Sequence, residues 1–204
     1  MLGAIIGDIV GSRFEWNNNK TKDFDFLTYR CRPTDDSIMS LAIAKAILMS
    51  KSNDELGQNA INYMQELGNK YPDAGYGGSF AFWLTENNPK PYNSWGNGAA
   101  MRVSAYGFAA TSFDEAKILS KLVTEVTHNH PEGIKGAEAT AVAIYMAKSG
   151  SSLLEIQDYI NKHYYKIDFK LDDIRTNILL MFHVRVLYPK LLKHFSNLQV
   201  LKML

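Results

Sequence analysis

The sequence predicts an all-α fold, and three observations support this prediction. Apolar residues recur at helical spacing along most of the 204 residues. Residues typical of helix ends flank these periodic segments. No segment alternates polar and apolar residues strongly enough to favour a strand over a helix. We therefore expect a compact, orthogonal bundle of six or more helices.

The first two helices have distinct features. In "GAIIGDIVGSRF", Gly3, Gly7 and Gly11 recur at spacing four, so one helix face lacks side chains and we expect another backbone to pack closely there. The second segment, "TDDSIMSLAIAKAILMSK", starts at Thr34, a residue type favoured before a helix. Apolar residues lie on several of its sides, which indicates a largely buried helix.

Four further segments predict helices with recognisable ends. We expect the first to stop at Gly68, and the third to run from Pro131 to just before Gly150. The segments are "NDELGQNAINYMQELGNKYP", "SFDEAKILSKLVTEVTH", "HPEGIKGAEATAVAIYMAKSG" and "SSLLEIQDYINKHYYK". Two glycine-rich connections separate them, "DAGYGGS" and "SWGNGAAMRVS", and the second leads into a helix predicted to begin near Ala99.

The composition gives no indication of a disulfide-stabilised, nucleic-acid-binding or membrane-spanning protein. A single cysteine, Cys31, excludes a disulfide framework and fits a reducing cytoplasm. The formal net charge of +1 gives no general argument for nucleic acid. No apolar stretch reaches the roughly 20 residues that cross a bilayer. We expect a cytoplasmic protein that binds neither nucleic acid nor membranes.

Two acidic stretches are candidates for chemistry. In "PTDDS", Thr34, Asp35 and Asp36 place oxygen atoms side by side at a helix start, which suits either helix capping or part of a Mg²⁺ or Mn²⁺ site. In "GDIVGSRFE", Asp8 and Glu15 share one helix face. They indicate either a solvated edge or a salt bridge to Arg13 or Arg102, or else a carboxylate held at a site.

The glycine and histidine stretches also allow two interpretations each. "SWGNGAAMRVS" is either a capped loop or a turn whose backbone N–H groups hold an anion. Tyr76 and Trp95 are either core aromatics or stacking surfaces for a base. In "THNHPEGIKGAEAT", His128 and His130 flank a helix start, and two histidines without a thiol do not complete a zinc site. They either cap the helix or contact a polar ligand.

Taken together and in this order, "GDIVGSRFE", "PTDDS", "GYGGSF", "WGNGAAMRVS" and "THNHPEGIKGAEATA" resemble the ADP-ribosylglycohydrolase family, over about residues 1–175. The resemblance implies an all-α fold with a binuclear Mg²⁺ or Mn²⁺ centre. It also implies hydrolysis of the glycosidic bond between ADP-ribose and an acceptor, which is an ADP-ribosylated protein or small molecule.

The resemblance assigns roles to residues of this sequence. Thr34, Asp35 and Asp36 match the family's first metal motif, and Glu15, Asp35 and Asp36 are the implied catalytic residues. The implied substrate-binding residues fall in the glycine-rich and histidine segments: Gly77, Gly78, Ser79, Asn97, Gly98, Ala99, Met101 and His128.

The last residues depart from the family pattern. No acidic residue follows Asp173, and the family's second metal motif, of the form GGDSDT, does not occur in this sequence. A permitted coding sequence for Leu180–Leu204, read one base earlier, gives "FDVSCQGTVPKAIEAFLESTSFEDA", which resembles the missing family segment. We therefore expect residues 176–204 to be an out-of-frame tail on a 1–175 domain; the alternative is a basic amphipathic helix.

This departure affects the expected function. Without the second ligand set, we expect weak metal binding and impaired hydrolysis by this chain. The alternatives are a non-catalytic ADP-ribose-binding protein and a non-functional product. The sequence does not indicate the acceptor group or the oligomeric state.

Overall fold

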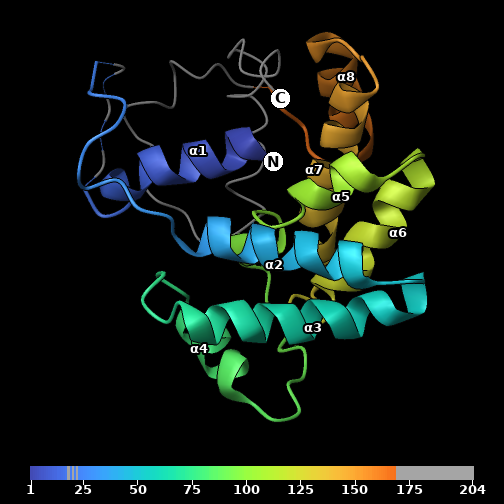
Figure 1. Cartoon of the computed structure of the whole chain (residues 1–204). Helices are drawn as coiled ribbons and strands as arrows, with labels where there is room; N and C mark the ends of the chain where they lie inside the picture. The colour runs from blue at the N-terminus through green and yellow to red at the C-terminus, as the bar shows by residue number, and fades with distance from the viewer. Residues whose placement is uncertain (18, 20, 22, 169–204) are drawn as a thin grey trace.

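The computed structural model describes residues 1–17, 19, 21 and 23–168 (Figure 1). The predicted out-of-frame tail, residues 176–204, lies outside the described residues, as do residues 169–175 of the predicted domain. The described residues form helices and no β-sheet, which confirms the all-α prediction. The α-helices are α1 (Leu2–Gly11), α2 (Asp35–Met49), α3 (Asn53–Lys70), α4 (Gly78–Thr85), α5 (Ser104–Ala109), α6 (Phe113–Thr124), α7 (Pro131–Lys148) and α8 (Leu153–His163), with 3-10 helices at Ser12–Phe14 and Asn97–Ala99.

The helices pack around α2 and α7. Helix α2 lies between α1 and α3 and also packs against α5, whereas α7 packs against α5, α6 and α8 (Figure 1). Helix α8 runs across the direction of α2 and α3, so the predicted orthogonal arrangement is present. Among the side chains that are fully buried, large ones of the core are Met39, Ile43, Met64, Tyr106 and Ile160.

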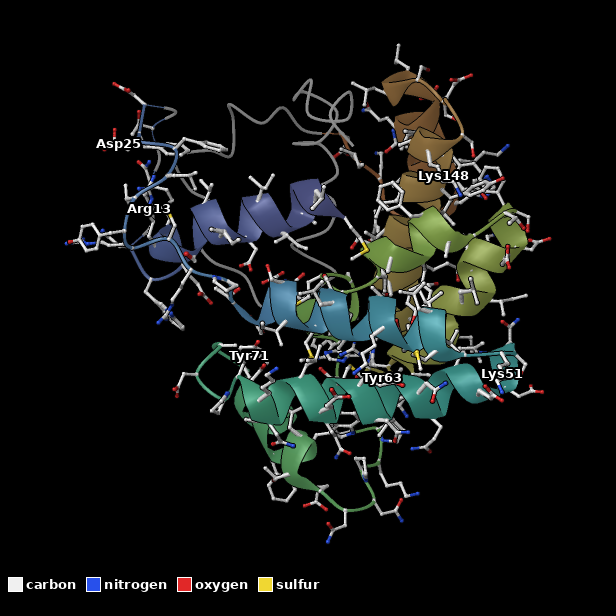
Figure 2. The ribbon with its side chains drawn as sticks, in the orientation of Figure 1. Arg13, Asp25, Lys51, Tyr63, Tyr71 and Lys148 are labelled. Atoms are coloured by element: carbon white, nitrogen blue, oxygen red, sulfur yellow. The ribbon has the colours of Figure 1, made fainter. Side chains whose placement is uncertain are left out.

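The predicted burial of the second helix is confirmed. Most of its central apolar residues, among them Ile38, Met39 and Ile43, are buried, whereas Leu41 is exposed. On its outer side, Lys45 donates to Glu66 of α3 at 2.8 Å and lies over the ring of Tyr63, which also belongs to α3 (Figure 2). These contacts join α2 to α3 at the surface as well as in the core.

Local signals also determine the ends of α7 and α8. Pro131 begins α7, and Gly150 follows its C-terminus with a φ of 89°, a conformation that glycine adopts without strain. At the start of α8, Ser152 and Glu155 form a reciprocal capping box. The predicted bounds of both helices are therefore confirmed to within about three residues.

Two further helix bounds differ from the prediction for a physical reason. Helix α3 continues to Lys70, because Gly68 is a packing residue rather than a stop; a Cβ there would lie 2.6 Å from the Leu84 side chain. The helix predicted near Ala99 is a 3-10 turn over Asn97–Ala99, and α5 begins only at Ser104. Helix α4, which starts at Gly78 inside a predicted connection, was not expected.

The predicted packing of the first helix is not seen among the described residues. No described atom lies within 4 Å of a Cβ built on Gly7 or Gly11. Helix α1 instead meets α2 through Asp8, while Leu2 and Ile6 are exposed. In the described part of the chain, no helix is both long enough and apolar enough to cross a membrane.

Candidate functional site

Asp8 joins the first helix to the start of the second. Its carboxylate accepts hydrogen bonds from the Thr34 amide at 2.8 Å, the Ser37 amide at 3.2 Å and the Ser37 hydroxyl at 2.5 Å. It also accepts a hydrogen bond from the Thr34 hydroxyl. Asp8 therefore caps α2 from another helix, and Thr34 occupies the N-cap position without capping through its own side chain.

Asp35, Asp36 and Glu15 lie near Asp8 and repel one another. Burial raises the pKa of Asp35 to about 7, with further contributions from Asp36, Glu15 and Asp8. Burial likewise raises the pKa of Asp36 to about 7, with Asp8 and Glu15 adding to the effect. Burial and Asp8 raise the pKa of Glu15, and Arg32 opposes this. The structure thus brings together all three predicted catalytic carboxylates.

The predicted salt bridges of this acidic face are absent from the described residues. Arg13 donates instead to the Thr28 hydroxyl at 3.0 Å and to the Asp25 carbonyl, in the segment beyond α1 (Figure 2). Arg102 is buried elsewhere and bonds to Val123 and Thr127. Neither arginine neutralises Asp8 or Glu15, so mutual repulsion persists at the carboxylates.

The donor set partly fits a hard cation. Carboxylate oxygens are the ligands that Mg²⁺ and Mn²⁺ prefer, and a bound cation would relieve the repulsion at Asp35 and Asp36. However, no group of three His, Cys, Asp or Glu side chains in the described residues is arranged to hold a metal ion. The Thr34 hydroxyl, a predicted ligand, is bonded to Asp8. The chemistry of the residues fits the ion, while their number does not complete a coordination shell.

The segment "DAGYGGS" lies against the acidic cluster, the name used here for Asp8, Glu15, Asp35 and Asp36. The Asp35 amide donates to the Ala74 carbonyl at 2.9 Å, and burial together with Asp35 raises the pKa of Tyr76 to about 12. Tyr76 packs edge-on against Phe80 with ring centroids 5.7 Å apart, so it is a core aromatic. The predicted substrate-binding residues Gly77, Gly78 and Ser79 are exposed at the start of α4.

The turn containing Gly98 is joined to the histidine segment. The Tyr92 amide donates to the Thr127 carbonyl at 3.1 Å, and the Asn93 amide donates to the Asn129 side chain at 2.8 Å. A Cβ built on Gly98 would lie 3.0 Å from the His128 ring. The structure therefore brings Gly98, which follows Asn97 in the turn, against His128.

The remaining predicted residues of this turn have different environments. Ala99 is fully buried, Met101 is half-buried, and the Met101 carbonyl accepts a hydrogen bond from Ser40 at 3.3 Å. His130 is the N-cap of α7, because its Nδ1 accepts from the Glu132 amide at 3.1 Å. The capping interpretation is thus confirmed for His130. Trp95 is partly exposed and lies beside the His130 ring.

A chain of side-chain contacts connects the acidic cluster with His128. From Tyr76 it passes through Phe80, over which the Arg102 guanidinium lies at 5.9 Å, and then to Thr127 and His128. Sequence reasoning did not assign Asp8, Arg102 or Thr127 to the site. The spacing of Asp8 and Glu15 on one helix face was a signal for Asp8; nothing local indicated the other two.

Two hollows in the described residues lie elsewhere. One of about 450 Å³ is lined by residues between Arg13 and Arg30, and one of about 680 Å³ lies between the start of α3 and α6. No predicted site residue lines either of them. The candidate site therefore rests on its carboxylates, its glycine turns and His128.

Comparison with known proteins decides which family this arrangement represents. The family model for ADP-ribosylglycohydrolase matches residues 1–185, most of the chain. The chain belongs to the ADP-ribosylglycohydrolase family. This membership confirms the family resemblance stated from the sequence motifs, and with it the implied fold class.

Several curated proteins are similar in sequence to this chain. The chain is 29% identical to the human ADP-ribosylhydrolase ARH3 over 187 residues, covering 76% of this chain and 50% of that protein. It is 32% identical to the Mus musculus ADP-ribosylhydrolase ARH3 over 185 residues, with the same coverage. The chain thus spans about half the length of the curated relatives it matches.

Proposed function

We propose that this protein hydrolyses the glycosidic bond between ADP-ribose and an acceptor, in a reaction that depends on Mg²⁺ or Mn²⁺. The observation that carries the proposal is the meeting of Glu15, Asp35 and Asp36 at the start of α2, in a chain of the ADP-ribosylglycohydrolase family. The relatives named ADP-ribosylhydrolase support the same class of substrate. The acceptor is a protein side chain or a small molecule.

Each carboxylate has a distinct proposed role. Asp35 and Asp36 would hold the divalent cation, which would supply positive charge to orient the ribose and to make a nearby water more acidic. Breaking the glycosidic bond builds positive charge on the ribose, and the Glu15 carboxylate stabilises that charge or accepts a proton. The raised pKa of Glu15 suits proton transfer nearer neutral pH. Asp8 holds α1 and α2 in the arrangement that brings these groups together.

Release of ADP-ribose tests the proposal. The 204-residue chain would be incubated with ADP-ribosylated arginine and serine peptides in Mg²⁺, Mn²⁺ or EDTA, and free ADP-ribose would be measured. We expect slow, cation-dependent release, because the described residues do not complete a metal shell. The Asp35→Asn/Asp36→Asn variant should lose it, and Asp158→Asn, an exposed residue of α8, is the matched control. Release that continues unchanged in EDTA would contradict the metal dependence.

A second candidate function is ADP-ribose binding without hydrolysis. It is favoured by the close approach of Gly98 to His128 and by the hydrogen bonds of Tyr92 and Asn93 to the histidine segment, none of which involves the acidic cluster. Calorimetric titration with ADP-ribose in EDTA tests it. Saturable binding without any release of ADP-ribose from the peptides would favour this function over hydrolysis, and absence of both would exclude it.

A further inference from the structure

Arg102 is a buried cation with an unusual set of partners. Only 1% of its surface is exposed, and no carboxylate pairs with it among the described residues. Its guanidinium Nη2 donates to the Thr127 hydroxyl at 2.5 Å and to the Val123 carbonyl at 3.3 Å. Because a guanidinium only donates hydrogen bonds, the Thr127 oxygen is an acceptor in this contact.

The hydroxyl proton of Thr127 must therefore point to another acceptor, and two lie within reach. His128 Nδ1 is 2.7 Å away, and the Thr124 carbonyl is 3.5 Å away. That carbonyl already accepts the amides of Thr127 at 3.2 Å and His128 at 2.8 Å. A third donor at 3.5 Å would gain little there, so the proton is directed to His128 Nδ1.

We propose that Arg102 and Thr127 are positioning residues that fix His128 in the neutral tautomer with its proton on Nε2. A nitrogen that accepts a hydrogen bond carries no proton, so the other ring nitrogen of the neutral imidazole carries it. Nε2 lies next to the turn of Gly98, 3.1 Å from where a Cβ on that residue would be. The ligand group that meets His128 must then be a hydrogen-bond acceptor. Only the identity of this ligand, ADP-ribose, rests on the proposed function.

The surroundings of His128 support a single neutral form. Burial lowers the pKa of His128 to about 2, and the positive charge of Arg102 acts in the same direction. The ring of Tyr92 packs beside the imidazole, with centroids 5.8 Å apart. The ring is therefore held from the side of Tyr92 and at Nδ1, while Nε2 has no hydrogen-bond partner among the described residues.

Nuclear magnetic resonance of the chain with ¹⁵N-labelled histidine tests the tautomer directly. Long-range proton–nitrogen correlation identifies which ring nitrogen carries the proton, and the His128→Asn spectrum assigns the signal. We expect His128 to be protonated on Nε2 in the unliganded chain at pH 7. A proton on Nδ1, or on both nitrogens, would overturn the proposal whatever the activity of the protein.

Two substitutions of Thr127 separate positioning from packing. Thr127→Ser keeps the hydroxyl and should keep the Nε2 proton, whereas Thr127→Val keeps the volume, removes the hydroxyl and should give a mixture of both tautomers. Thermal unfolding confirms that each variant folds. If Thr127→Val does not fold, the wild-type and Thr127→Ser spectra still show which ring nitrogen of His128 carries the proton. An unchanged tautomer in folded Thr127→Val would overturn the role of Thr127.

Titration with ADP-ribose tests the ligand separately. The Nε2–H signal should move on saturation, and Thr127→Val should bind ADP-ribose about five- to tenfold more weakly than wild type, the loss expected for one hydrogen bond. Thr127→Ser should bind within about twofold of wild type. If the tautomer is as proposed but ADP-ribose neither binds nor moves the signal, the proposed function fails at this residue and the positioning role stands.

Discussion

At the residue scale, the repulsion among the carboxylates predicts an unusual dependence of stability on pH. The pKa values of Asp35 and Asp36 are raised from 3.8 to about 7, so the folded state binds more protons than the unfolded state between these limits. In the presence of a chelator, which keeps metal ions from the carboxylates, the free energy of unfolding should therefore fall as pH rises from about 4 to about 7, and then level off. Denaturant titrations across this range measure the change.

The Asp36→Asn variant tests the cause of this dependence. Removing one carboxylate should flatten the fall and make the variant more stable than wild type at pH 8, by roughly 1–3 kcal/mol. The control is Asp158→Asn on the exposed side of α8. If the free energy of unfolding of Asp36→Asn falls with pH as steeply as that of wild type, the raised pKa values do not arise from the acidic cluster.

A second prediction at this scale concerns Gly98. In Gly98→Ala the new methyl group would lie 3.0 Å from the His128 ring, which Thr127 and Tyr92 hold in place. We expect a loss of roughly 1–2 kcal/mol in the free energy of unfolding, measured by urea denaturation. Gly77→Ala is the control for stability, because no described atom lies within 4 Å of its added Cβ. Equal effects in the two variants would show that His128 can move aside.

At the scale of elements, the contact between α5 and α7 depends on a glycine. A Cβ at Gly107 would overlap the Ile144 side chain and lie 2.9 Å from the Ala141 carbonyl. Gly107→Ala should therefore lower the free energy of unfolding by roughly 2–3 kcal/mol, because backbone cannot give way as a side chain does. Gly57→Ala in α3 meets only ordinary contacts and should stabilise by roughly 0.5–1 kcal/mol. Urea denaturation compares the two; a neutral Gly107→Ala would contradict this packing.

The sequence predicts an element well when local residues stabilise it, and poorly when distant residues do. The ends of α7 and α8 depend on Pro131, Gly150 and the Ser152–Glu155 capping box, all of which are local signals. Helix α4 was missed and α5 was predicted to start too early, because short glycine-containing segments form helices here through contacts with distant residues. Gly68 illustrates the same ambiguity: a glycine that suggests a helix end in the sequence is a close contact with Leu84 in the fold.

The site shows the same division between local and distant information. Glu15, Asp35 and Asp36 were predicted because their motifs are contiguous, and they do meet in space. The hydrogen bonds of Asp8 to residues 26 and 29 positions later could not be derived from local spacing. Neither could the contact of Arg102 with Thr127, which lies 25 residues away.

At the scale of the whole molecule, a divalent cation should stabilise the fold by neutralising the acidic cluster. At about 100 times its Kd and pH 8, Mn²⁺ should add roughly 2.7 kcal/mol of stability, or roughly 5–10 °C in the temperature of thermal unfolding. Calorimetry first gives the Kd, and scanning fluorimetry then gives the shift. An equal shift in Asp35→Asn/Asp36→Asn would place the cation elsewhere.

The hydrogen bonds from Asp8 to Thr34 and Ser37 have a consequence for how the carboxylates assemble. The same side chain that anchors α1 to α2 also accepts hydrogen bonds from the Thr34 and Ser37 amides, so the start of α2 is capped only while α1 is in place. If α1 separates from α2, Glu15 moves away from Asp35 and Asp36, and the first turn of α2 loses its cap at the same time. Docking of the N-terminal helix and formation of the acidic centre are therefore a single cooperative step.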